Sequence, residues 1–155
     1  MDVKSYVAKE LQDLGRGLER YLDGLAEEEV HWVPQSGAAS ITDHLFHAAR
    51  FEDEFVQRRI LGRPELWAAP DSAWPSSADS EFRHVLGYYK AVRSATAACI
   101  EGLNPVDLER PAAIPQGEVR VADVLSIVCC HFAQHLGAIT YLRRLQRGPA
   151  GVDHD

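Results

Sequence analysis

Residues 121–147 read VADVLSIVCCHFAQHLGAITYLRRLQR, the most apolar stretch of the chain. The side chains at helical spacing along it, three or four positions or a multiple apart, are Val124, Val128, His131, His135 and Leu142. That spacing places residues on one face of an α-helix. Gly148 and Pro149 follow the stretch and are typical of the residues that end helices. The stretch therefore predicts a core helix that carries two histidines on its inward face.

Three further segments show helical periodicity and are bounded by turn residues. These segments are residues 3–25, 40–61 and 80–101. Ser40 is expected to cap the second of them, together with Asp43 three residues later. The connections 64–79 and 103–120 are long and rich in proline, which favours crossovers over simple hairpins. The fold class predicted is all-α, a four-helix bundle with long crossover connections.

Bulk properties limit the classes of partner. The 155 residues fit one domain, predicted to be the bundle over residues 1–149 with a disordered tail over 150–155. With 23 acidic and 16 basic residues the net charge is -7, so neither nucleic acid nor an anionic membrane surface is an expected partner. No signal segment and no apolar stretch long enough to span a bilayer is expected. The three cysteines, Cys99, Cys129 and Cys130, are interpreted as reduced core residues of a cytoplasmic protein.

The histidines are the candidate site. His131 and His135 are four residues apart on one helix, a spacing at which two imidazoles can share one metal ion. The alternative to a metal site is that both are core histidines whose ring nitrogens are hydrogen-bonded to hydroxyls or backbone carbonyls of a neighbouring helix. On the second helix either His44 or His47 is close enough to complete the site, and periodicity alone leans towards His44. Phe132 stands where zinc proteases carry a glutamate, so the pattern does not favour a peptidase.

Two motifs carry a resemblance to a known family. Residues 40–52, SITDHLFHAARFE, resemble the second-helix motif of the DinB-like superfamily. Residues 121–125, VADVL, followed by 131–137, HFAQHLG, are similar to its fourth-helix motif, although Ala138 stands where members often have Gln. The resemblance implies a metal triad of His47, His131 and His135. It leaves His44 as a pocket residue, a partner of a ligand, or a packed surface histidine.

The resemblance also implies a range of activities. Members include metal-dependent hydrolases and S-transferases that use a low-molecular-weight thiol, and we expect a small-molecule substrate. The expected cofactor is a divalent metal, zinc or nickel first and iron next, because imidazole suits all three. The alternative is a non-catalytic stress-response or binding protein whose metal is structural. Bundles of this kind often form homodimers. Separately, the charged run Glu52 to Glu54 is interpreted as a solvated helix face.

Overall fold

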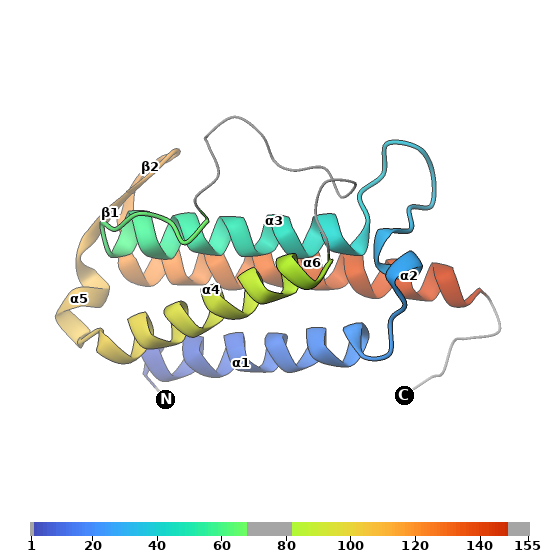
Figure 1. Cartoon of the computed structure of the whole chain (residues 1–155). Helices are drawn as coiled ribbons and strands as arrows, with labels where there is room; N and C mark the ends of the chain where they lie inside the picture. Colours follow the sequence, from blue (N-terminus) through green and yellow to red (C-terminus); the bar gives the residue numbers. More distant parts are fainter. Residues whose placement is uncertain (1, 68–81, 149–155) are drawn as a thin grey trace.

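Four long helices lie side by side in the computed structural model, which describes residues 2–67 and 82–148 (Figure 1). They are α1 (Val3–Leu22), α3 (Ile41–Asp53) with its π-helical continuation η1 (Glu54–Ile60), α4 (Phe82–Gly102) and α6 (Val121–Arg147). The predicted all-α four-helix bundle is therefore confirmed. The predicted tail, 150–155, lies outside the described residues.

Chain direction shows where the bundle departs from a simple series of hairpins. In Figure 1, α1 and α6 run one way along the bundle, while α3 and α4 both run the other way. Because α3 and α4 are parallel neighbours, the chain must return along the bundle between them. The first long connection is therefore a crossover, as predicted, whereas the second joins α4 to α6 at one end of the bundle.

The second connection and the segment before α3 contain short elements that the sequence analysis did not predict. They are α2 (Glu27–His31), α5 (Pro105–Glu109) and the antiparallel strands β1 (Pro111–Ile114) and β2 (Gly117–Arg120). Side-chain contacts hold the two short helices in place. Asn104 caps α5 through two backbone amides, for example, and Arg143 of α6 bonds to Glu29 of α2 at 3.0 Å.

Helix α3 begins where the sequence predicts, at a reciprocal cap. The backbone amide of Asp43 donates to Ser40 Oγ at 3.1 Å, and the amide of Ser40 donates to Asp43 Oδ2 at 2.8 Å. At the other end, Gly62 takes a φ of 63°, a left-handed conformation that glycine adopts without steric cost. The cap and the glycine together fix the segment that carries His44 and His47.

Two charged residues predicted to face solvent are buried instead. Glu52 is 1% exposed and Asp53 is fully buried. Asp53 accepts hydrogen bonds from the backbone amides of Leu66 and Trp67, both at 3.0 Å, and from the Tyr88 hydroxyl at 2.7 Å. The prediction failed because these carboxylates have partners on other segments, which local sequence does not reveal.

Trp67 packs against Phe46 and Tyr88 at the start of the first long connection. The prediction that all three cysteines lie in the core is confirmed only in part. Cys99 and Cys129 are buried, and burial raises the pKa of both thiols. Cys130 is exposed, so its assignment to the core is wrong: it falls on the face of α6 opposite the packed one.

Helix α6 spans the residues that the sequence predicted, Val121–Arg147. It has 27 residues and a window of mean hydropathy 1.3, which meets the length and composition of a membrane-spanning helix. Length and composition alone do not identify a membrane span. A core helix passes the same test, and α6 packs against both α1 and α3.

Candidate metal centre

Three histidines from two neighbouring helices converge at one point of the bundle. His47 projects from α3, and His131 and His135 project from successive turns of α6. One ring nitrogen from each lies within 4.8 Å of the others. The structure thus brings together the three residues that the family resemblance implied. All three histidines are half-buried. The prediction that they occupy core positions is wrong, because Val128 and Phe132 take the inward face of α6.

The spacing fits a transition-metal ion. Metal–nitrogen bonds of about 2.0–2.1 Å at tetrahedral angles place the nitrogens about 3.3 Å apart. His131 Nε2 and His135 Nε2 are 3.3 Å apart, and neutral imidazole nitrogens at that distance are the donors such an ion uses.

His44 contacts the triad from the turn before His47. Its Nδ1 lies 3.0 Å from Nδ1 of His135. If His135 binds an ion through Nε2, its Nδ1 carries the proton and donates it to His44, which fixes the tautomer and the plane of the ligand. The sequence left three roles open for His44. The geometry favours one of them, a hydrogen-bond partner of the candidate metal-binding residue His135.

An aromatic stack holds the ring of His131, and the sequence analysis did not identify it. The ring of Phe51 lies on that of His131 with centroids 3.7 Å apart and planes 14° apart. Phe55 continues the stack, 4.0 Å from Phe51. The signal was present in the sequence, since Phe51 and Phe55 follow His47 at intervals of four on the same helix. The stack restricts rotation of His131 about its side-chain bonds.

Burial keeps the site in the form that binds metal. Burial first, and then the neighbouring histidines, lower the pKa of His135 to about 3. Burial, followed by the proximity of His47, lowers the pKa of His131 to about 4. The pKa values of His44 and His47 are also lowered, chiefly by burial. The imidazoles are therefore neutral near pH 7, the form in which histidine binds a metal ion.

Comparison with known proteins agrees with this arrangement. Residues 10–139 match the family model of the DinB superfamily. The chain belongs to the DinB superfamily. The match includes all three triad histidines, and the resemblance seen in the two helix motifs is thereby confirmed. A search of curated proteins found no match.

Two solved structures share the fold of this DinB-superfamily chain. A conserved protein from Enterococcus faecalis superposes with a TM-score of 0.80 at 18% identity, covering 96% of this chain and 99% of that one. YfiT from Bacillus subtilis superposes with a TM-score of 0.67 at 15% identity, covering 93% and 87%. YfiT is described as a probable metal-dependent hydrolase with an unusual four-helix bundle topology.

The other described histidines lie apart from the triad. His31 is half-buried on α2, where its ring nitrogen lies 3.1 Å from Glu27. His84 is exposed on α4. His154 lies outside the described residues. His84 is therefore a suitable control position for substitutions in the triad.

Replacing His44 with alanine is expected to weaken metal binding about 10–100-fold, the usual cost of losing a residue that orients a metal-binding histidine. The His135 ring would lose its acceptor at Nδ1 while all three ligands remain. Competition titration against a chromophoric chelator measures the change. His84→Ala should bind as tightly as the unmodified protein, and an equally tight His44→Ala variant would contradict the role assigned to His44.

Acidification is expected to destabilise the metal-free protein below about pH 6.5, where histidines of an unfolded chain take up protons. In the folded chain the pKa values of His131 and His135 are about 4 and 3. The unfolded state therefore binds more protons between these limits, so the free energy of unfolding falls as the pH falls. Urea unfolding with chelator at pH 7 and pH 5 measures the effect. A His131→Gln/His135→Gln variant should lose less stability over this range, and an identical loss would contradict the explanation.

Proposed function

We propose that the chain is a metal-dependent hydrolase acting on a small molecule, with a divalent ion held by His47, His131 and His135. The observation that carries the proposal is the convergence of three neutral imidazoles at a half-buried position. Three protein ligands leave coordination positions for water or substrate, whereas structural sites usually have four. The description of YfiT as a probable metal-dependent hydrolase supports the same reaction class.

The chemistry divides between the ion and the residues around it. Zinc, nickel or iron held by imidazoles supplies Lewis acidity, which polarises a carbonyl or phosphoryl oxygen and lowers the pKa of bound water. His44 keeps the proton on Nδ1 of His135 and so directs its Nε2 to the site. Phe51 fixes the plane of His131 and supplies an apolar wall beside it.

The nearby carboxylates do not provide a general base. Glu52 is buried against Arg93, Asp53 accepts three hydrogen bonds, and Glu54 pairs with Arg59 at 2.5 Å. Each of these groups is therefore held by a structural partner. We infer that proton transfer in the reaction uses water, the substrate itself or the exposed side of His44.

The test uses protein purified without added metal, whose metal content is first determined. Esters, amides and lactones are then assayed alone and with glutathione-type thiols. We expect hydrolysis without thiol, abolished by chelation and restored by one equivalent of metal, with His84→Ala fully active. Turnover that requires a thiol would instead show that the protein is an S-transferase. A lack of turnover in every arm, combined with a large fall in melting temperature on chelation, would assign the ion a structural role.

A further inference from the structure

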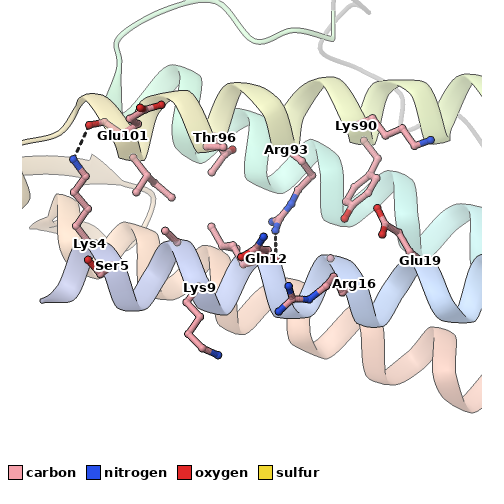
Figure 2. Close-up of a pocket in the computed structure, with 16 residues that line it drawn as sticks. Lys4, Ser5, Lys9, Gln12, Arg16, Glu19, Lys90, Arg93, Thr96 and Glu101 are labelled. Carbon is pink, nitrogen blue, oxygen red and sulfur yellow. Dashed lines mark hydrogen bonds between the residues drawn. The ribbon is translucent and has the colours of Figure 1, made fainter. Parts of the chain in front are cut away.

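A second candidate site lies on the opposite pair of helices. A groove of about 810 Å³ separates α1 from α4 (Figure 2), and none of the triad histidines lines it. Its volume is within the range of about 300–1,000 Å³ found for sites of small molecules. The site proposed below is independent of the metal centre.

Small residues keep this groove open. Ala8 and Gly15 line it from α1, and Ala97 lines it from α4. A Cβ at Gly15 would stand 3.6 Å from the Tyr89 hydroxyl and 3.8 Å from Nη2 of Arg93. The glycine therefore leaves space beside the Tyr89 hydroxyl and beside Arg93 Nη2, which also donates to the carbonyl of Leu11. Nearer the other end, the buried side chains of Leu11 and Ile100 form an apolar floor.

The groove also gathers positive charge in an acidic chain. All three lysines of the sequence line it. The lining cations are Lys4, Lys9, Arg16, Lys90 and Arg93, and the lining carboxylates are Glu19 and Glu101. Asp13 pairs with two of these cations, and Glu52 pairs with Arg93. Five cations against four carboxylates leave one net positive charge, on a chain whose net charge is -7.

Two polar groups of the groove have bonding capacity to spare. Thr96 is 1% exposed, and its hydroxyl has no hydrogen-bond partner among residues 2–67 and 82–148. A buried hydroxyl without a partner is costly, and Thr96 lies one helical turn from Arg93, so it can donate to a polar ligand atom bound at the level of Arg93. Lys90 is exposed at the Gly15 end and forms no ion pair within the described residues (Figure 2).

We propose that the α1/α4 groove binds an amphipathic monoanion, a carboxylate with an unbranched apolar chain. The carboxylate lies over Gly15, where Lys90, Arg16 and the Tyr89 hydroxyl can approach it. The apolar chain runs towards Ala8 and Ile100, a distance of about 10 Å along α1 at 1.5 Å per residue. One net positive charge matches one carboxylate, which is why a monoanion is favoured over a phosphate monoester.

Calorimetric titration of the full-length, metal-loaded protein tests the proposal. The probes are decanoate below its critical micelle concentration, decanol, decyltrimethylammonium and acetate. We expect saturable 1:1 binding of decanoate and at least tenfold weaker binding of the other three. Equal binding of decanol or of the cation would overturn the charge assignment, and a lack of saturable decanoate binding would overturn the site.

Matched glycine variants locate the binding. Gly15→Leu fills the groove, whereas Gly87→Leu places the same side chain on α4 in open space. We expect Gly15→Leu to weaken decanoate binding at least tenfold with metal content and circular dichroism unchanged, and Gly87→Leu to bind normally. Equal affinities of the two variants would overturn the location. If Gly15→Leu does not fold, the exposed Lys90→Gln variant decides: a loss of threefold or more supports the site, and unchanged affinity overturns it.

Discussion

Replacing His135 with alanine is expected to abolish stoichiometric metal binding and the activity that depends on it. The substitution removes one of three ligands and also the group that His44 bonds. The loss of affinity should therefore exceed the about 10–100-fold expected for His44→Ala. Elemental analysis after dialysis against a weak chelator, with circular dichroism to verify the fold, measures the result.

The control for this experiment is His84→Ala, since His84 is exposed on α4 and remote from the triad. It should retain one equivalent of metal. His47→Ala and His131→Ala should behave as His135→Ala does. A His135→Ala protein that keeps a full equivalent of metal would place the ion elsewhere.

The largest effect on stability is expected from Glu52→Ala, at about 3–5 kcal/mol lost from the free energy of unfolding. Glu52 Oε2 accepts from Nη1 of Arg93 at 2.9 Å, and the two side chains are 1% and 15% exposed. Arg93 also donates to the carbonyl of Leu11 and lies over the ring of Phe132, so it bridges three helices. Without Glu52 its charge would remain buried and unpaired. Urea denaturation measures the loss.

A double variant separates the loss of the ion pair from a general effect of changing the core. Glu52→Leu with Arg93→Met replaces the pair by apolar side chains of similar size, which is often neutral or stabilising. We expect it to recover most of the stability lost in Glu52→Ala. If the double variant is as unstable as the single one, the explanation by an unpaired charge is wrong.

The fold could be predicted because its determinants are local. The periodicity of residues 121–147, the cap formed by Ser40 and Asp43, and the glycines that follow α1, η1 and α6 all lie within a few residues of the feature they specify. Helix α5 and the β1–β2 hairpin were missed for the opposite reason. Each is short, and its contacts with α6 and η1 come from distant parts of the chain.

The candidate site, too, could be predicted only as far as local sequence specifies it. Two ligands at i and i+4 on one helix could be recognised from spacing, but the third comes from another helix, and periodicity favoured His44 over His47. The structure explains the ambiguity, because both residues reach the same cluster, His47 as a member of the triad and His44 through Nδ1 of His135. Only the relative placement of α3 and α6 distinguishes them.

Buried charge was the main failure of the sequence analysis. Glu52 and Asp53 lie in a run of acidic residues, a pattern that usually marks a solvated face. Their partners, Arg93 and Tyr88, are about 40 and 35 positions away along the chain. The charge of a residue therefore predicted its need for a partner but not where that partner would be found.

The central claim is that His47, His131 and His135 bind one ion together. Crystals of protein purified without added metal, measured at wavelengths on either side of the absorption edge of the metal found by elemental analysis, test it most directly. The expected result is a single anomalous peak about 2.0–2.2 Å from a ring nitrogen of each of the three histidines. A peak elsewhere, or a triad whose rings face solvent with no peak between them, would contradict the account.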